Sequence, residues 1–456
     1  MNIRRRFRAL AAAAFLSLFS GGTAQAGLLA GFAKEDITPA PGCYLGGYYF
    51  RSETATGVHD PLFARAIVFD SGGKRAALVT LDLVIINGVL AGEVKTDINE
   101  KLGIPPEYIS ISATHTHAGP QGYYEEYGKY PKIFDPEMKR FMKEKITAAV
   151  VRAVASLAPA SVAFASFQLD GFSHNRHDPD GPVDRTAVLM VVRDPAGAPV
   201  AGFLNFAAHP TVLGAGNLEI SGDWAGAFSA AMEEKLGGNA VFQLVQGAAG
   251  NIGPAARLGG TFDSCRDIAE RMSSAVLDRF DSAQPVSDFP VAAALESHTL
   301  KVKSRKSVME FAKKLPELKE QIMETELPAD VKNRRIGWLE ERQGTESFLQ
   351  MIIPTMSRVR KGATDTAVQV IRLGPALVVT MPGEAITEFS IRFREDLKPF
   401  TVVVQAYAND HLGYIVDEKV LNEGGYEASM SLVYPSEAER LYSSVLDMAE
   451  RLTKGH

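Results

Sequence analysis

The chain has 456 residues, of which 46% are hydrophobic and 22% charged, and its formal net charge at pH 7 is -6. A chain of this length and apolar content can bury a large core, so it is predicted to be an ordinary globular protein with one to three domains. The mild negative charge argues against a nucleic-acid partner and against charge-driven binding to an anionic membrane, but leaves a peripheral apolar membrane contact open.

The first 26 residues have the pattern of a signal peptide. Four arginines in MNIRRRFR precede the apolar run ALAAAAFLSLF, and AQA closes the segment with the small-x-small pattern that precedes cleavage. We therefore expect cleavage after Ala26 and export to the periplasm or beyond, by the Sec or the twin-arginine route. The run is shorter than the ~20 residues of a transmembrane helix. In an oxidising compartment, Cys43 and Cys265 could form one disulfide.

Short β-rich runs alternate with helical patterns after the signal segment, which predicts an α/β fold: a mixed β-sheet core covered by helices. Residues 64–86 indicate two strands joined by a Ser-Gly-Gly turn. Residues 134–157 predict a helix with Asp135 as N-cap and Pro136 at the first helical position.

The second half of the chain continues this rhythm. Residues 187–210 predict a second hairpin, residues 221–238 a capped helix and residues 240–247 a strand. Three more strands are expected within residues 367–384 and 401–410. Between them, residues 303–363 are highly charged, helical in pattern and without strand signals. We expect a helical insertion there, either a solvated excursion or a lid or oligomer contact.

Polar residues recur at the ends of the predicted strands. His115 and His117 follow the run ISISA, and because side chains two apart in an extended segment point the same way, both could face one cavity. His209 ends the second hairpin, and Glu384 follows a strand and Pro-Gly. A third strand is followed by Asn409, Asp410, His411 and Tyr414.

Imidazoles and carboxylates are suitable ligands for zinc, which in catalytic sites keeps one position open for water. For the HxH pair alone, local hydrogen bonding is the competing interpretation. Together, the recurring polar residues predict a metal site gathered from separate strands.

Several sequence blocks, in order, resemble the neutral, non-lysosomal ceramidase family. They are GFAKEDITP, GVHDPLFARAIVF, ISATHTHAGPQGY, NFAAHPTVLG, ISGDWAG, MPGE, and NDHLGYIV followed by GGYEAS, and they extend over roughly residues 30–435. The resemblance implies a zinc-dependent catalytic domain over residues 27–456. It would hydrolyse the amide of ceramide or a related N-acyl compound by attack of a zinc-activated water. This reaction would belong to sphingolipid metabolism.

The resemblance also implies roles for individual residues. One zinc ion per chain would be bound by His115, His209, Glu384 and Tyr414. The residues facing the scissile amide would be His117, Arg176 and Tyr426. A metal favours the deprotonated form of a phenol ligand. His117, Tyr426 and Arg176 would donate hydrogen bonds to the developing oxyanion, and His117 or Tyr426 would protonate the departing nitrogen.

The chain also departs from the family pattern. A family G-D-x-S-P block reads GNIGP here, so Asn251 and Gly253 replace the aspartate and the serine. A serine acyl-enzyme is thereby excluded at that position, while attack by water remains available. No immunoglobulin-like domain is expected after the last block. Two alternatives stay open: a zinc-dependent esterase or lactonase, and a catalytically inactive periplasmic binding protein that retains the metal site.

A few residues are weaker candidates. Asp82 could orient a ligand histidine, as carboxylates near metals do. The segment GGYYF near residue 46 could line an acyl pocket or simply pack. Further candidate substrate contacts are His174, His177 and His411.

Overall fold

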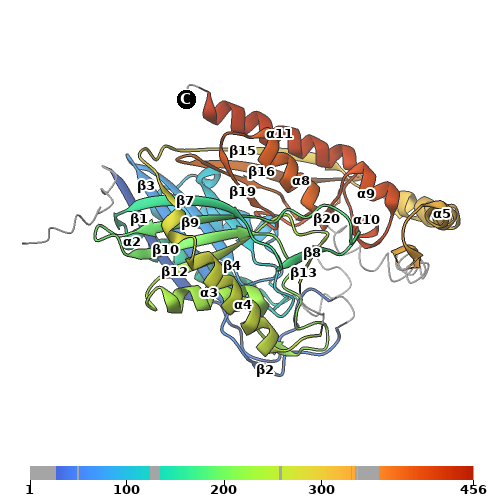
Figure 1. Ribbon diagram of the computed structural model, residues 1–456, viewed down its shortest axis with the longest axis horizontal. Helices are drawn as coiled ribbons and strands as arrows, with labels where there is room; N and C mark the ends of the chain where they lie inside the picture. Colours follow the sequence, from blue (N-terminus) through green and yellow to red (C-terminus); the bar gives the residue numbers. More distant parts are fainter. Residues whose placement is uncertain are drawn as a thin grey trace, which may run out of the picture.

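The computed structural model describes residues 27–48, 51–123, 134–255, 259–303, 305–329, 331–333, 336 and 359–454. The expected signal peptide lies outside these residues, as do residues 337–358 of the expected helical insertion. Three β-sheets with helices on their outer faces make up most of the described part (Figure 1), so the prediction of a mixed sheet core covered by helices is confirmed.

The first sheet has the strand order β5-β4-β3-β1-β6. Its strands are β1 (Leu28–Asp36), β3 (Phe63–Ser71), β4 (Lys74–Leu81), β5 (Ile109–Ala113) and β6 (Ala158–Pro159). β3 and β4 form the predicted hairpin, and its turn requires glycine because Gly72 and Gly73 both have positive φ. Two helices pack beside this sheet: α1 (Gly88–Leu102) and α2 (Pro136–Ala155). As predicted, Asp135 caps α2 and Pro136 is its first residue.

The second sheet has the order β12-β10-β9-β7-β14. Its strands are β7 (Ser161–Gln168), β9 (Thr186–Arg193), β10 (Pro199–Phe206), β12 (Val241–Gln246) and β14 (Gln284–Pro285). Its helices are α3 (Asp223–Lys235) and α4 (Phe262–Leu277). The N-cap of α3 is Gly222, without a side-chain cap; the Asp223 carboxylate instead accepts from the backbone of Val212 and Leu213 and so anchors the preceding loop.

The third sheet has the order β15-β16-β17-β19. Its strands are β15 (Val291–Lys301), β16 (Ala363–Leu373), β17 (Ala376–Thr380) and β19 (Thr401–Gln405). Helices α8 (Thr387–Asp396) and α11 (Pro435–Thr453) lie against it. Short 3-10 helices, η1 (Pro106–Tyr108) and η2 (Phe280–Ser282), complete the connections.

The three sheets share one topological unit: an antiparallel hairpin, a crossover helix and a parallel strand. The crossovers are β4-α1-β5, β10-α3-β12 and β17-α8-β19. The strands that end the units, β5, β12 and β19, are edge strands that meet one another, since Ala113 N donates to Tyr407 O and Ala406 N donates to Gln246 O. The loops that follow these strands therefore gather at one end of the molecule. In folds with such crossovers, ligands bind beyond the carboxyl ends of the parallel strands.

The central core lies where the inner faces of the sheets meet. It contains apolar residues of every sheet, among them Phe69, Phe203 and Val403, each fully buried. Burial of this shared core holds the three units in fixed relation, which a site built from all three of them requires.

Three short strand pairs lie among the loops. They are β2 (Gly57–Val58) with β11 (Glu219–Ile220), β8 (Ser173–Asn175) with β13 (Ile252–Pro254), and β18 (Glu384–Ala385) with β20 (Tyr414–Ile415). Two short helices follow β20: α9 (Glu418–Glu423) and α10 (Tyr426–Met430).

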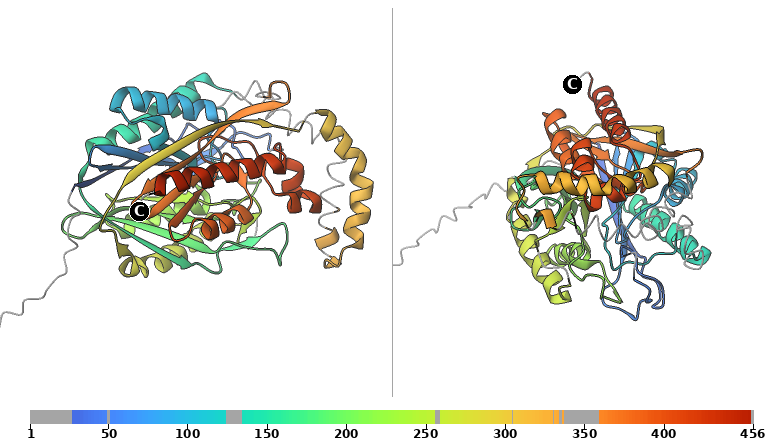
Figure 2. Two further views of the ribbon diagram at one scale, coloured as in Figure 1. Left: turned by 90° about the horizontal axis from the view of Figure 1, so that it is seen from above. Right: turned by 90° about the vertical axis from the view of Figure 1, so that its right-hand side faces the viewer.

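Helix α5 (Arg305–Glu324) belongs to the region in which a helical insertion is expected. It lies at one end of the molecule, apart from the three sheets (Figure 2). The division of the chain into domains remains a prediction.

Two further sequence expectations concern export and membranes. Cys43 and Cys265 are both free thiols, so the disulfide left open above is absent. Among the described residues, none of the helices combines the length and apolar character needed to cross a bilayer.

Candidate metal centre

The candidate site residues gather at the carboxyl ends of the crossover strands. His115 and His117 follow β5, and His209 follows β10. Glu384 and Tyr414 begin β18 and β20, and these parallel strands pair them directly. The separate strand ends foreseen from the sequence therefore meet at one place, through the topology of the three sheets.

His115 is held by backbone geometry and by packing. Its Nδ1 lies 2.7 Å from the carbonyl oxygen of Val84, and its ring stacks on Tyr407 with centroids 4.2 Å apart. Its φ is +70°, so the segment is not extended at this residue. His115 and His117 do face one site, but the reason given from the sequence, the alternation of side chains along an extended segment, is wrong. The two rings converge because the chain turns at His115.

His209 is fully buried and is held in a similar way. Its Nδ1 lies 3.1 Å from the carbonyl oxygen of Ile252, in β13. Burial and the nearby Arg176 lower the pKa of His209 to about 4, so the imidazole is neutral at physiological pH. Nε2 therefore carries a free lone pair when Nδ1 donates to the carbonyl.

Glu384 joins the two imidazoles. Its Oε2 lies 3.3 Å from Nε2 of His115 and 3.2 Å from Nε2 of His209. Burial by itself would raise the pKa of Glu384, but the neighbouring His115 and His209 lower it well below its ordinary value. An ionised carboxylate and two imidazoles thus point their ligand atoms at a common centre.

His117 differs from the other two histidines. Its Nε2 lies 3.1 Å from Nε2 of His115, and the Nε2 or Nδ1 atoms of His115, His117 and His209 all lie within 4.8 Å of one another. However, Nδ1 of His117 is buried and has no hydrogen-bond partner within the described part of the chain. Metal-binding histidines almost always donate their second nitrogen to a carbonyl or carboxylate, as His115 and His209 do. The geometry thus favours His115 and His209 as ligands over His117.

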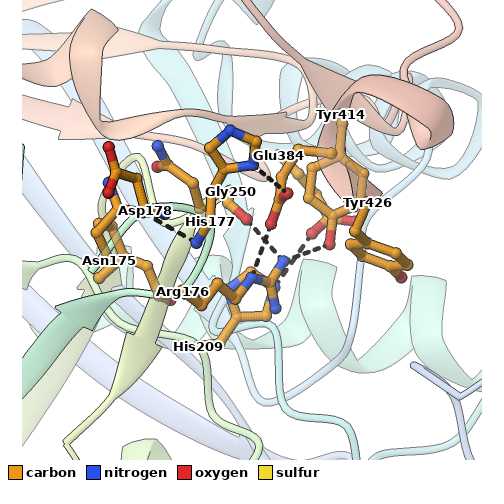
Figure 3. A network of polar contacts seen from close by, with 12 residues as sticks. Asn175, Arg176, His177, Asp178, His209, Gly250, Glu384, Tyr414 and Tyr426 are labelled. Carbon is orange, nitrogen blue, oxygen red and sulfur yellow. Dashed lines mark hydrogen bonds and ion pairs between the residues drawn. The ribbon is translucent and has the colours of Figure 1, made fainter. Parts of the chain in front are cut away.

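Arg176 and two tyrosines form the other wall of the site (Figure 3). The Nη2 of Arg176 donates to the Tyr414 hydroxyl over 2.8 Å and to the Gly250 carbonyl over 2.7 Å. Its Cζ lies 5.5 Å from the ring centroid of Tyr426, which meets the Tyr414 ring edge-on. Burial raises the pKa of Tyr414 well above its ordinary value, whereas Arg176 acts in the opposite direction.

The structure adds a residue that the sequence did not single out. Glu427 is buried and accepts from Nε of Arg176 over 3.1 Å. Its second oxygen lies 3.3 Å from Nδ1 of His177, whose Nε2 lies 3.2 Å from Glu423. The available signal was its place beside Tyr426 in GGYEAS. His177 thus contacts the carboxylate that binds Arg176, on the oxygen that Arg176 leaves free.

Other sequence candidates have different surroundings. Asp82 binds the buried Arg65 over 2.7 Å, so the hypothesis that it orients a ligand histidine is wrong. Nε2 of His411 lies 3.9 Å from Glu384, beside the metal centre. His174 pairs with Gly253 across β8 and β13.

The donor chemistry fits a zinc ion. Two imidazoles, each with Nδ1 held by a backbone carbonyl, and one carboxylate form a His₂Glu set, which is known among catalytic zinc sites. Tyr414 lies next to Glu384 in the β18–β20 pair and is available as a further oxygen donor.

Comparison with known proteins gives one family. The profile described as "Neutral/alkaline non-lysosomal ceramidase, N-terminal" matches residues 28–257, about half of the chain. The chain is similar to neutral ceramidase 1 of Arabidopsis thaliana, with 30% identity over 225 residues that cover 45% of this chain and 29% of the relative. It is also similar to the neutral ceramidase of Mycobacterium tuberculosis, with 31% identity over 232 residues, 46% of this chain and 36% of the relative. The matched region therefore spans only about a third of these relatives.

A longer match extends over almost the whole chain. The neutral ceramidase of Pseudomonas aeruginosa is 24% identical over 485 aligned positions, which cover 92% of this chain and 72% of that protein. The crystal structure of neutral ceramidase from Pseudomonas aeruginosa superimposes with a TM-score of 0.75 at 21% identity, covering 93% of this chain and 74% of the other. At this identity the structural match establishes the fold.

Proposed function

Because the chain belongs to the neutral/alkaline non-lysosomal ceramidase family, we propose that it is a zinc-dependent hydrolase that cleaves the amide bond of ceramide or a related N-acyl lipid. The observation that carries the proposal is that Oε2 of Glu384 lies 3.3 Å from Nε2 of His115 and 3.2 Å from Nε2 of His209, close enough for all three atoms to bind one metal ion. Arg176 and Tyr426 beside them provide donors for a carbonyl oxygen.

One zinc ion per chain would be bound by His115, His209, Glu384 and Tyr414. When bound, zinc supplies a nucleophile derived from water near neutral pH and polarises the amide carbonyl. Arg176 contributes to this set because its positive charge, 2.8 Å from the Tyr414 hydroxyl, favours the phenolate form of that side chain.

The remaining groups act on the substrate. His117 and Tyr426 lie beside the ligand side chains His115 and Tyr414 and, together with Arg176, can donate hydrogen bonds to the carbonyl oxygen that becomes negatively charged. An amide nitrogen must be protonated as it leaves, and either His117 or Tyr426 can deliver that proton. Burial and the neighbouring His115 and His209 lower the pKa of His117 well below its ordinary value, so its imidazole is neutral before the reaction.

A substrate panel on the purified protein tests this function. The expected result is about one zinc per chain and hydrolysis of an N-acyl sphingoid lipid that stops on chelation and returns with zinc. Hydrolysis that continues after complete metal removal contradicts the proposal.

The same panel separates the alternatives. Turnover of esters or lactones without turnover of any amide assigns an esterase or lactonase. A full complement of zinc without turnover of amides, esters or lactones assigns a binding protein. The panel is necessary because Gly253, which stands where the family pattern has serine, directly follows Ile252, whose carbonyl oxygen holds His209.

Export is part of the proposal. The pattern of residues 1–26 supports cleavage after Ala26, and the lipid substrate would be met at a membrane surface through peripheral contact. Intact-mass analysis of protein recovered from the periplasm or medium tests this: a mature chain that starts at Gly27 is expected, and an uncleaved chain in the cytoplasm contradicts it.

A further inference from the structure

His117 raises the question of what orients its ring. His115 and His209 each have Nδ1 held by a backbone carbonyl, but Nδ1 of His117 has no hydrogen-bond partner among the residues that the structure describes. Apart from the contact of its Nε2 with Nε2 of His115, the ring is positioned by packing.

The packing surface is the segment of residues 43–48 together with Arg51, which we call the cap loop. A Cβ placed on Gly47 would lie 2.3 Å from Cγ of His117, and Gly47 has a φ of +90°. The backbone of Gly47 therefore lies directly against the imidazole, where no side chain fits. Tyr48 closes another side, with its ring centroid 4.8 Å from that of His117 at 70°.

Arg51 fastens this loop. Arg51 is only 8% exposed, and the charge of Glu53 acts on it without forming an ion pair within the described part of the chain. The guanidinium donates instead to backbone carbonyls of Gly46, His117, Gly214 and Ala215, over 2.9 to 3.3 Å. Its Cζ also lies 4.9 Å from the Tyr48 ring centroid.

These contacts join three loops at one point: the cap loop, the loop that carries His115 and His117, and the loop that follows His209. Five N–H groups in a rigid plane suit a guanidinium to this task, and a lysine could not reach the four carbonyls at once. The buried guanidinium thus holds backbone from all three loops.

We propose that Arg51 is a positioning residue that sets the orientation of His117 by holding Gly47 and Tyr48 against its ring. The part of this inference that concerns turnover rests on the proposed function. The part that concerns the orientation of His117 can be measured without any substrate.

The test compares Arg51→Met with Arg372→Met in the full-length, zinc-loaded protein. Arg372 is a matched control: it is 6% exposed, donates to the carbonyls of Gly374 and Leu452, and has its Cζ 5.8 Å from the Phe400 ring centroid. In spectra of histidine ring nitrogens, we expect the His117 signals to shift or broaden in R51M alone. The His115 and His209 signals should stay near their original positions in both variants.

Turnover provides the second readout. R51M should keep its zinc and lower kcat roughly tenfold to a hundredfold with KM little changed, since small misplacements of a reacting group have effects of this size. Unchanged His117 signals in R51M, or equal changes in R51M and R372M, overturn the inference. Loss of zinc in R51M also overturns it, because Arg51 would then support the metal ligands.

The outcome for the proposed function is separate. If the wild-type protein hydrolyses no amide but the His117 signals still respond to R51M alone, the positioning inference stands and the proposed function fails. If R51M does not fold, Tyr48→Leu tests the same contact, because it removes the ring beside His117 and leaves the backbone bonds of Arg51 in place. Unmoved His117 signals in Y48L contradict the inference.

Discussion

Arg176 donates a hydrogen bond to the hydroxyl of Tyr414 over 2.8 Å and so links β8 to β20, 238 residues further along the chain. The same guanidinium binds Glu427 and the carbonyl of Gly250. One side chain thus connects a candidate metal ligand to the loop after β12 and to α10. The resemblance implied Arg176 only as a residue facing the amide, and the structure shows that its guanidinium makes three polar contacts in this wall of the site.

Replacement of Arg176 by methionine is expected to reduce kcat/KM for an N-acyl lipid roughly a hundredfold to a thousandfold, the usual effect of removing a donor from an oxyanion site. Glu427 would also be left buried without its arginine partner, with His177 still beside it. The measurement is steady-state hydrolysis at equal zinc content. Arg271→Met is the control, because Arg271 pairs with Asp267 at the surface and lies near a ring, Phe172. Equal rates for both variants and the wild type contradict the assignment.

The ligand set predicts a pattern of zinc loss. His115→Ala, His209→Ala and Glu384→Ala should each lose most of the bound zinc, since each removes one of the donors that meet at the centre. His117→Ala should keep its zinc and lose turnover, because Nδ1 of His117 lacks the carbonyl contact of a ligand histidine. Elemental analysis after dialysis decides between them. Zinc loss in H117A equal to that in H115A would show that His117 is a ligand.

Gly253 and His174 are expected to be coupled. A Cβ on Gly253 would lie 2.9 Å from Cε1 of the His174 ring, so Gly253→Ser must displace that ring or shift β13. Because β13 also carries the Ile252 carbonyl that holds His209, we expect lower zinc affinity or turnover in G253S. The double variant Gly253→Ser/His174→Ala removes the clash and should recover much of the loss. Additive losses in the double variant would show that the two positions are independent.

Lys95 predicts a pH-dependent stability. It is buried on α1, and burial lowers the pKa of its amine to about 7, against about 10.4 for an unfolded lysine. Between these two pKa values the Lys95 amine is protonated in the unfolded chain and neutral in the folded protein, so its contribution to stability rises with pH. The destabilisation caused by burying the charged amine is fully present below pH 7. Lys95→Met should therefore raise the free energy of unfolding at pH 6.5 by at least about 1 kcal/mol, with a smaller gain at pH 9.

Urea unfolding at the two pH values measures this effect. Lys101→Met, at the exposed end of the same helix and paired with Asp97, is the control and should change stability little at either pH. A gain in K95M that is the same at pH 6.5 and pH 9 would mean that the amine is already neutral or well solvated in the folded protein.

Much of the fold could be predicted because its signals are local. The Asp135-Pro136 start of α2 and the Gly72–Gly73 turn of the first hairpin depend on neighbouring residues only, and both are confirmed. The strand ends that carry His115, His209 and Glu384 were also visible, since polar residues after apolar runs stand out in the sequence. What these signals could not give is the relation between units.

The tertiary structure decided the points that depend on distant contacts. The φ of His115, the partner of Asp82 and the support of Arg176 by Glu427 each contradict or extend the local interpretation. Arg51 left no sequence signal, because its four carbonyl partners come from three loops up to 164 residues away. The sequence by itself determined the elements, the family resemblance and the candidate donors. The meeting of three sheets decided which histidine rings are held by a backbone carbonyl and which are not, since backbone groups far apart in the chain become neighbours only when the shared core forms.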